Sequence, residues 1–381
     1  METDLRPRVC LPFVGDSVGG SHISAGQLIA ALDRSRFEPV VVLHRDGPTA
    51  PYLRELGVGY RSLDLPALAG EGSQLAGIAS AQVRSAGTLR RFLAKERIAL
   101  VHTNDLRMHL TWSPATRLAG RRHVWHQRVL LSGSPLWRLI PYLTSQVVCP
   151  SEAVRATLPK SARARTAVIR DPVADPPAAD FRGRLREELR LPSTAPVVGF
   201  VGNMMHQKRP HIFVEAAAHA IRAGETQTAF VLFGDDRGGE LRSTQELVRT
   251  LGIEGNVHFA GYRRPIEPWL TALDLLLAPG VGDAFGRTLV EAMLAGVPVV
   301  AVASGGHLET IADGRTGYLT PPDDSAALAE AALRLLRDPT LRRRLAEAGR
   351  VAARDAFGAD RHARQIESVY DAVLGMPVSR R

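Results

Sequence analysis

The sequence predicts an α/β protein with two Rossmann-like domains that face each other across a cleft. Strand-like apolar runs alternate with helical patterns in both halves of the chain, which is typical of βαβ units and a mainly parallel sheet. At 381 residues the chain is too long for one ordinary core and suits two domains. Between the halves, the Pro-rich stretch DPVADPP at 171–177 interrupts the pattern and indicates a linker.

The first domain is expected over residues 1–174. Its opening strand, RVCLPFV at 8–14, is followed by three glycines, the last of them Gly20, and then by a helix. A Gly-rich turn from strand to helix lets a ligand approach the backbone closely, although many α/β turns contain glycine. The segment 65–82, rich in Gly, Ala and Ser, is either a mobile loop near an acceptor or a surface connection. The later strands are expected at 39–43, 99–102, 123–126 and 146–149.

The second domain is expected over residues 175–358. After Pro321 the pattern is nearly all helical, over 325–337 and 340–356. Ligands of open α/β sheets bind outside the carboxyl ends of the strands, so two such domains place a ligand in the cleft between them. The strands are expected at 197–201, 229–233, 257–260, 275–278 and 299–302.

The composition indicates a soluble globular protein, with 45% hydrophobic and 23% charged residues. No apolar run approaches the length that crosses a bilayer, and the charged start at 1–8 is not followed by a signal-peptide core. Cys10 and Cys149 show no metal or redox spacing, which agrees with a reducing compartment. We therefore expect a cytoplasmic protein.

The net charge of +9 comes entirely from the first half of the chain. Residues 1–170 contain 23 Lys and Arg against 12 Asp and Glu, whereas residues 171–381 contain 25 against 27. A basic surface of this kind could contact anionic lipid at the inner face of the membrane, or an acidic acceptor; no nucleic-acid partner is expected. The alternative is an ordinary solvated surface in an arginine-rich protein. The basic residues concerned are Arg84, Arg90, Arg91, Lys95, Arg97, Arg117, Arg121, Arg122 and Arg128.

The stretch 282–302 combines a Gly-bearing loop, a helical pattern over 287–293 and a β-branched strand from Val297. The first turn of such a helix leaves backbone N–H groups without partners, and the helix dipole adds to their effect, so an anionic ligand is favoured there. Gly286 has no side chain to block that approach. The N–H groups around Gly286 to Leu289 are therefore candidate phosphate donors.

Two carboxylates, Asp283 and Glu291, stand eight residues apart, one in this loop and the other on the second turn of the helix. Both could face one pocket and accept hydrogen bonds from hydroxyl groups. Backbone donors for phosphate beside carboxylates for hydroxyls suit a nucleotide-sugar. The alternative is that the two carboxylates are a helix cap and part of a solvated face.

A lysine and a histidine lie at the ends of predicted strands. Lys208 stands six positions after the strand-end Gly202, which would place an ammonium over the cleft, where it could neutralise a departing diphosphate. His126 ends the strand 123–126 and could hydrogen-bond the sugar or the reaction centre. The alternatives are a solvated lysine and a histidine satisfied by backbone groups. His102 is a weaker candidate of the same kind as His126.

The joint pattern resembles a known family. An acidic residue, seven residues and then Glu, with Phe-Gly inside and Glu-Ala-Met at its end, resembles the signature of retaining GT-B glycosyltransferases of family 4, the glycosyl transferases of group 1. The resemblance implies that Asp283 contacts sugar hydroxyls and that Glu291 holds the ribose. It also implies that the backbone of Phe285 and Gly286 contacts sugar or phosphate. The family usually has Glu where this chain has Asp283.

The resemblance extends to Lys208, because the family has this Gly-to-Lys spacing and uses the lysine on the donor phosphates. It often has Arg directly after the glycine, where this chain has Asn203, so fewer charges hold the diphosphate, or Arg209 or Arg263 takes part instead. The implied catalytic residues are His126, Lys208 and Asp283. The implied donor-binding residues are Gly20, Gly202, Lys208, Arg209, Arg263, Asp283, Phe285, Gly286, Arg287, Thr288, Leu289 and Glu291.

The resemblance implies the GT-B fold, in which the last helix, here within 359–381, crosses back to the first domain. It implies a retaining, hexosyltransferase-like enzyme that moves a sugar from a UDP- or GDP-linked donor to a hydroxyl of an envelope glycan, a glycolipid or a natural product. No Asp-X-Asp and no zinc spacing occur in the sequence, so neither a metal nor another cofactor is expected. A nucleotide-sugar epimerase, a phosphorylase on the same scaffold and a non-catalytic sugar-nucleotide-binding protein are the alternatives.

Overall fold

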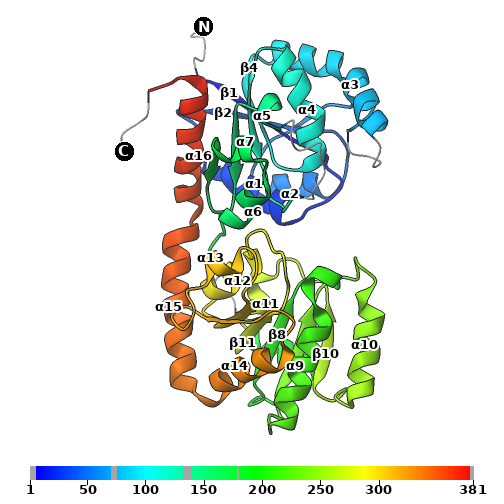
Figure 1. Ribbon diagram of the computed structural model, residues 1–381, viewed down its shortest axis with the longest axis vertical. Coiled ribbons are helices and arrows are strands. Elements are labelled where there is room, and N and C mark those ends of the chain that lie inside the picture. Colours follow the sequence, from blue (N-terminus) through cyan, green and yellow to red (C-terminus); the bar gives the residue numbers. More distant parts are fainter. Residues whose placement is uncertain (1–5, 70–74, 132–139, 178–179, 378–381) are drawn as a thin grey trace. The chain divides into compact units, whose positions relative to one another are not determined.

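The computed structural model describes residues 6–69, 75–131, 140–177 and 180–377 (Figure 1). The chain divides into two compact units: unit 1 is Met1–Pro172 with Ala359–Arg381, and unit 2 is Val173–Gly358. Each unit contains a parallel sheet with helices packed on both faces, which confirms the predicted α/β class with two Rossmann-like domains. The predicted linker at 171–177 contains the boundary between the units.

The sheet of unit 1 has the strand order β3-β2-β1-β4-β5-β6-β7, and its paired strands are all parallel. Its central strands are almost entirely buried because both faces of the sheet are covered. In the register, Cys10 lies between Val40 and Val101. The strands are β1 (Arg8–Phe13), β2 (Glu38–Leu43), β3 (Arg61–Ser62), β4 (Ile98–Thr103), β5 (Arg122–His126), β6 (Gln146–Cys149) and β7 (Thr166–Val168).

The helices of unit 1 are α1 (Gly20–Ala31), α2 (Thr49–Glu55), α3 (Leu75–Lys95), α4 (Leu106–Leu118), α5 (Ile140–Leu143), α6 (Glu152–Thr157), α7 (Lys160–Arg163) and α16 (Ala359–Leu374). α1, α2 and α16 share one core with the sheet, where Phe37 and Tyr370 meet edge to face with ring centroids 5.3 Å apart. α3 and α4 pack around Trp112 in another core. The segment 65–82 was predicted as a loop or a connection, but from Leu75 onward it is helical, while 70–74 lie outside the described residues.

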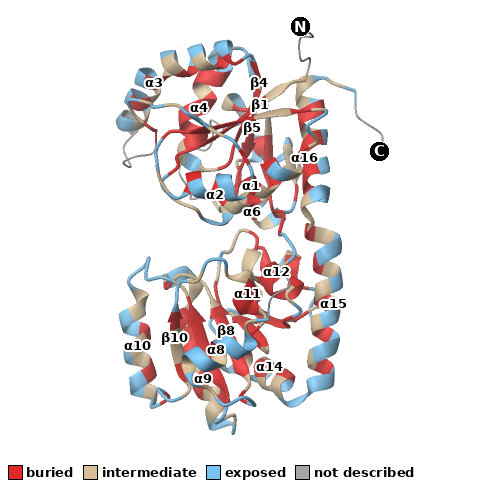
Figure 2. Cartoon of the chain, turned by 180° about the vertical axis from the view of Figure 1, so that it is seen from behind, coloured by how far each residue is buried: buried red, intermediate tan, exposed pale blue. Residues whose placement is uncertain are grey.

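The sheet of unit 2 has the strand order β10-β9-β8-β11-β12-β13. Buried strands lie at its centre (Figure 2). The predicted strands are present, and the short β13, which pairs with β12, was not predicted. The strands are β8 (Val197–Val201), β9 (Ala229–Phe233), β10 (Val257–Gly261), β11 (Leu275–Ala278), β12 (Val299–Val302) and β13 (Tyr318–Thr320).

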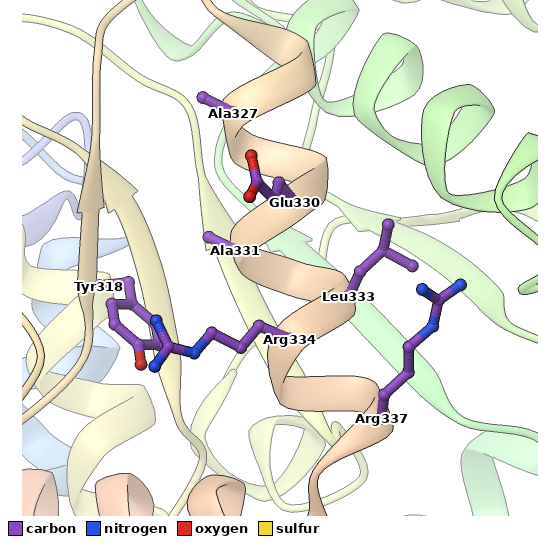
Figure 3. A pocket seen from close by; sticks show the side chains of 7 residues that line it. All are labelled: Tyr318, Ala327, Glu330, Ala331, Leu333, Arg334 and Arg337. Carbon is purple, nitrogen blue, oxygen red and sulfur yellow. The ribbon is translucent and has the colours of Figure 1, made fainter.

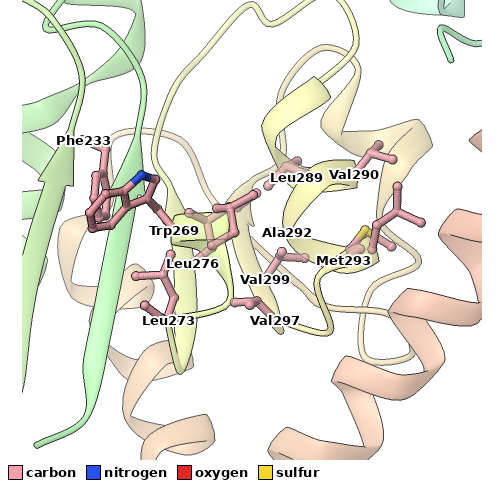
Figure 4. Packing of buried hydrophobic residues seen from close by; sticks show 14 of the residues in the cluster. Phe233, Trp269, Leu273, Leu276, Leu289, Val290, Ala292, Met293, Val297 and Val299 are labelled. Carbon is pink, nitrogen blue, oxygen red and sulfur yellow. The ribbon is translucent and has the colours of Figure 1, made fainter. Parts of the chain in front are cut away.

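The helices of unit 2 are α8 (Arg182–Leu189), the 3-10 helix η2 (His206–Lys208), α9 (Pro210–Arg222), α10 (Glu240–Leu251), α11 (Glu267–Leu270), α12 (Arg287–Leu294), α13 (His307–Thr310), α14 (Ser325–Arg337) and α15 (Pro339–Phe357). Two apolar cores enclose the sheet. In one of them Trp269, Leu289 and Met293 pack with the strands (Figure 4). The apolar face of α12 is therefore anchored in the core, and this fixes the position of the loop that precedes it.

Three neighbouring strands, β8, β11 and β12, end at the same edge of the unit 2 sheet because they are parallel. The loops that follow them are pressed together. A Cβ at Gly306, after β12, would lie 2.6 Å from the Cα of Phe285, and one at Gly305 would overlap the carbonyl oxygen of Asp283. Only glycine permits this approach of two backbones, and it brings the residues after β12 against the loop after β11.

Candidate functional site

Lys208, Asp283 and His307 meet at the carboxyl edge of the unit 2 sheet. The Nζ of Lys208 lies 2.6 Å from Oδ1 and 2.8 Å from Oδ2 of Asp283. The Nε2 of His307 lies 3.2 Å from the same Oδ2. Lys208 follows β8, Asp283 follows β11 and His307 follows β12. The structure thus brings together two residues that the sequence predicted for the donor site and one that it did not.

The Asp283 carboxylate is ionised in this arrangement. Burial acts to raise its pKa, but the ammonium of Lys208 and the hydrogen bond to His307 outweigh burial and hold the pKa well below its usual value. Its side chain is 24% exposed and that of Lys208 is 31% exposed, so the pair is partly open to solvent. An anionic ligand that approached Lys208 would compete with Asp283 for the ammonium.

The helix α12 starts at this edge with Gly286 as its N-cap, in the left-handed conformation with φ 79°. A Cβ at Gly286 would lie 2.9 Å from Cδ2 of His307, so a side chain fits neither the backbone nor the space. Leu289 and Val290 donate their backbone N–H groups to the Gly286 carbonyl. The Leu289 amide, predicted as a phosphate donor, is therefore already used by the first turn of the helix.

Phe285 and Glu291 flank this turn and are both buried. The Phe285 ring packs edge to face on Phe357 with centroids 5.4 Å apart, so its backbone is the part that a ligand could meet. Arg287 donates from Nε to Oε1 of Glu291 across 2.7 Å. Burial raises the pKa of Glu291, and Arg287 partly offsets this effect. Glu291 is thus tied to Arg287, one turn earlier on the same helix, rather than part of a solvated face.

Three other predicted donor residues also belong to unit 2. Gly202 lies beside the Lys208 side chain, since a Cβ there would be 3.4 Å from Lys208 Cγ. Arg209 pairs with Asp323, with Nη2 3.3 Å from Oδ1. Arg263 pairs with Glu188 and lies over the Trp269 ring, 4.9 Å from its centroid. Both arginines are therefore engaged by other carboxylates than Asp283.

His307 was missed from the sequence, although a signal was present. The turn Gly305-Gly306-His307 follows the predicted strand 299–302, as glycines follow the strands at Gly15 and Gly202. A Gly-Gly pair after a buried strand indicates close backbone approach, and the next side chain is then held near whatever the glycines touch. Here they touch the backbone of 283–285.

The predicted histidine of unit 1, His126, lies fully buried at the end of β5. Its Nδ1 is 3.2 Å from His102 Nε2 and 3.2 Å from Arg128 Nη2, and its Nε2 has no hydrogen-bond partner among the described residues. Burial first, and then Arg128, lower the pKa of both histidines well below the usual value, so both are neutral. The alternative was a histidine that hydrogen-bonds to backbone groups. In the described residues, the hydrogen-bond partners of the His126 ring are side chains instead.

The neighbours of His126 form a buried polar network in unit 1. Arg128 pairs with Asp171 and also donates to Oδ1 of Asn104. The Tyr370 hydroxyl, from α16, lies 2.5 Å from Nδ1 of His102. Gly20, which was predicted to bind the donor, is the first residue of α1 in unit 1, and Gly19 is the N-cap of this helix.

A hollow elsewhere on unit 2 lies beside α14 (Figure 3). The Arg334 guanidinium lies over the Tyr318 ring, 5.2 Å from its centroid. None of the predicted donor residues lines this hollow, so it is separate from the group around Lys208. In the described parts of the chain, no three His, Cys, Asp or Glu residues are placed to hold a metal ion. Besides Tyr318 and Arg334, the hollow is lined by Ala327, Glu330, Ala331, Leu333 and Arg337.

Comparison with known proteins finds a glycosyl transferase family model for each half of the chain. Residues 195–338 match the model of the glycosyl transferases group 1, and residues 19–174 match that of the glycosyl transferase 4-like domain. The 2-deoxystreptamine glucosyltransferase of Streptomyces kanamyceticus is 35% identical over 195 residues, 50% of each chain. The N-acetyl-alpha-D-glucosaminyl L-malate synthase of Bacillus anthracis is 31% identical over 191 residues, 50% of this chain and 49% of the other. The chain thus spans about half the length of these relatives.

Solved structures with the same fold cover nearly the whole chain. Anabaena HepE in complex with UDP-glucose has a TM-score of 0.81 at 22% identity, over 96% of this chain and 99% of that one. Sucrose-phosphate synthase from Thermosynechococcus elongatus has a TM-score of 0.75 at 22% identity, over 97% of this chain and 100% of the other. Identity at this level supports the fold alone. From the matches of both halves, the chain belongs to the glycosyl transferases of group 1 and has the GT-B fold.

Proposed function

We propose that the protein transfers a sugar, with retention of anomeric configuration, from a nucleoside diphosphate sugar to an acceptor hydroxyl. The observation that carries this proposal is the group Lys208–Asp283 beside the start of α12, with the buried Glu291 one turn further on. A cation for the diphosphate, a helix start and two carboxylates for hydroxyls lie within one sheet edge. Anabaena HepE, which shares the fold, was solved with UDP and with UDP-glucose, and this supports a nucleotide-sugar donor.

The proposed chemistry is displacement on one face of the sugar. The bond between the anomeric carbon and the diphosphate oxygen breaks, and its electron pair leaves with the diphosphate. The acceptor oxygen forms the new bond on the same face, and its proton passes to the departing diphosphate oxygen. Lys208 stabilises the charge that develops on the diphosphate, Asp283 orients the sugar hydroxyls and Glu291 holds the ribose. We propose no metal or other cofactor for this reaction.

The donor and acceptor are proposed by class only. The donor carries UDP or GDP, and the acceptor is a hydroxyl of an envelope glycan, a glycolipid or a natural product. The curated relatives include enzymes named for 2-deoxystreptamine, for L-malate and for D-inositol 3-phosphate, which are small hydroxyl-bearing compounds. A panel of such acceptors with UDP- and GDP-sugars is therefore the first screen.

The test follows donor consumption and product stereochemistry. The wild-type protein is incubated with each donor, with and without acceptor, and the products are examined by NMR. A transferase forms a glycoside of retained configuration only when acceptor is present, and Lys208→Met lowers the rate. Conversion of the donor without acceptor would instead favour an epimerase. Binding of the donor without any turnover would favour a sugar-nucleotide-binding protein.

We propose that a basic surface of unit 1 binds a second partner, an anionic membrane. α3 contains no acidic residue, and it lies beside α4 (Figure 1). Arg97 directly precedes β4 and Arg121 directly precedes β5, and these parallel strands are neighbours, so both arginines lie at the amino edge of the sheet. Arg117, Arg121 and Arg122 line a polar hollow there. Arg128, predicted for this surface, is instead buried and paired with Asp171. Among the other predicted basic residues, which the structure describes, none is paired with a carboxylate: Arg84, Arg90, Arg91, Lys95, Arg97, Arg117, Arg121 and Arg122.

We propose that acidic phospholipid headgroups contact the amino edge of the unit 1 sheet. Each basic residue near an anionic bilayer contributes about 1 kcal/mol, so Arg121→Glu with Arg122→Glu should weaken binding by about tenfold or more. The assay is sedimentation with vesicles of phosphatidylglycerol and phosphatidylcholine. The matched control is Arg343→Glu with Arg344→Glu on α15, which should change little. Equal loss in both variants, or equal binding to phosphatidylcholine alone, would remove the proposal. Among the described helices, none is both long and apolar enough for a membrane span.

A further inference from the structure

The ring of His307 is held between two hydrogen-bond acceptors. Its Nδ1 lies 3.0 Å from the carbonyl oxygen of Val302, and its Nε2 lies 3.2 Å from Oδ2 of Asp283. A carbonyl oxygen and an ionised carboxylate can only accept hydrogen bonds, whereas a neutral imidazole carries one N–H. Both contacts are satisfied together only when both ring nitrogens are protonated. The geometry therefore indicates an imidazolium at His307.

The ring has little room to adopt another position. The side chain is 1% exposed, and its Cδ2 faces Gly286, where even a Cβ would come within 2.9 Å. The turn before it is fixed by Gly306, which donates its N–H to the Asp283 carbonyl oxygen across 2.8 Å. The loop that carries Asp283 and the turn that carries His307 are thus joined by backbone and by side chains. A change at His307 is transmitted directly to the Asp283 carboxylate.

The charged side chains of unit 2 discussed above differ in how many oppositely charged partners each one has. Arg209, Arg263 and Arg287 are each matched by a carboxylate, those of Asp323, Glu188 and Glu291 respectively. Asp283, in contrast, faces two cations, Lys208 and His307. Asn203, which follows β8 before η2, is uncharged and accepts from the Asp235 amide across 3.4 Å. The group Lys208–Asp283–His307 therefore carries one net positive charge at this edge, and that charge depends on the His307 proton.

We propose that His307 is a positioning residue of the donor site, which holds the Asp283 carboxylate and supplies the positive charge that the Lys208–Asp283 pair lacks. This inference rests on the proposed function. When the diphosphate takes the Lys208 ammonium, Asp283 keeps a cationic partner in His307 and stays in place for the sugar hydroxyls. Without the imidazolium, the charges of Lys208 and Asp283 sum to zero. A diphosphate that took the Lys208 ammonium would then leave the Asp283 carboxylate without a cationic partner.

The first test concerns the protonation of the ring itself and needs no ligand or activity assay. In protein labelled with ¹⁵N-histidine, NMR of the ring nitrogens should show both nitrogens of His307 protonated at neutral pH without donor. His307→Gln identifies the signals, since it removes them. A neutral ring, with one protonated and one bare nitrogen, would overturn the inference whatever the activity of the protein.

The second test separates binding from chemistry. His307→Gln retains a hydrogen-bond donor of similar reach but not the charge, and His219→Gln, on α9 of the same unit, is the matched control. We expect the dissociation constant of UDP and the donor KM to rise about tenfold in His307→Gln, with a much smaller change in kcat, and no change in His219→Gln.

Two outcomes distinguish this inference from the proposed function. Transfer activity with equal UDP affinity in wild type and His307→Gln would refute the role of His307 and leave the transferase intact. A protein that binds no nucleotide-sugar would refute the proposed function, while the NMR result would still report the protonation of His307. Asn203→Arg in the His307→Gln background offers a rescue: the added charge should restore part of the UDP affinity, and failure to do so would contradict the electrostatic explanation.

Discussion

Replacing Asp283 by Asn should tighten the binding of UDP and lower sugar transfer. In the donor-free protein, the Lys208 ammonium is 2.6 and 2.8 Å from the two carboxylate oxygens, and the diphosphate has to displace them. With side chains 31% and 24% exposed, this is a partly buried pair, worth ~1–2 kcal/mol. Removing the competing charge should therefore strengthen UDP binding by about 5- to 30-fold. Transfer should fall by about 100-fold, because the sugar loses its carboxylate.

The assay is calorimetric titration of UDP into four proteins: wild type, Asp283→Asn, Lys208→Met and the double variant. The gain from Asp283→Asn should disappear when Lys208 is also replaced, because the gain comes from the released ammonium. Transfer is measured separately at saturating donor. UDP binding that is unchanged or weaker in Asp283→Asn would refute the reasoning that Lys208 exchanges one anion for another.

Three further predictions concern stability. Gly286→Ala should lower the free energy of unfolding by ~1–2 kcal/mol more than Gly314→Ala, since both have positive φ but only Gly286 also faces a side chain at 2.9 Å. Arg128→Met should cost ~3–5 kcal/mol, because it leaves the carboxylate of Asp171 buried without its cation. Burial lowers the pKa of three unit 1 histidines to about 4, so the unfolded chain binds more protons below about pH 6.5. Unit 1 should therefore lose up to ~1.4 kcal/mol per histidine per pH unit as the pH falls from about 6.5 toward 4.

These stability predictions are checked by urea unfolding, with tryptophan fluorescence and far-UV circular dichroism as probes. Equal effects of the two glycine substitutions would contradict the packing of Gly286 on His307. A mild effect of Arg128→Met, below ~1 kcal/mol, would contradict the burial of its pair with Asp171. Stability that stays constant from pH 7 to about 4.5 would show that the histidines do not titrate as their burial requires. UDP binding by Arg128→Met at neutral pH serves as the control that unit 2 remains folded.

Much of the fold could be predicted from local sequence. The strands of both units are apolar runs bounded by turn residues, and the helix from Arg287 has clear spacing. The short β13 was missed because three residues, Tyr318–Thr320, give no periodicity. The start of α3 was missed because Gly, Ala and Ser dominate it and its apolar face is weak. The short strands β3 and β7 of unit 1 were missed as well, since two and three residues give no periodicity either. These errors lie where the element is defined by its neighbours rather than by its own side chains.

Two members of the candidate site, Lys208 and Asp283, could be predicted, but not their pairing and not His307. Lys208 and Asp283 were both assigned to the donor, yet their contact spans 75 residues and depends on β8 lying beside β11. The same holds for His307, which reaches Asp283 only because β12 is the next strand. The pair Arg287–Glu291, by contrast, has helical i,i+4 spacing, so the sequence alone contained that information.

The measurement that tests the central claim most directly is the affinity for nucleotide-sugars of two lysine variants. UDP-glucose and the corresponding GDP-sugar are titrated into wild type, Lys208→Met and Lys160→Met, the last an exposed lysine of α7 in unit 1. One of the donors should bind to wild type and to Lys160→Met alike, and Lys208→Met should weaken it by about tenfold or more. Equal binding by all three proteins would contradict a donor site built on Lys208.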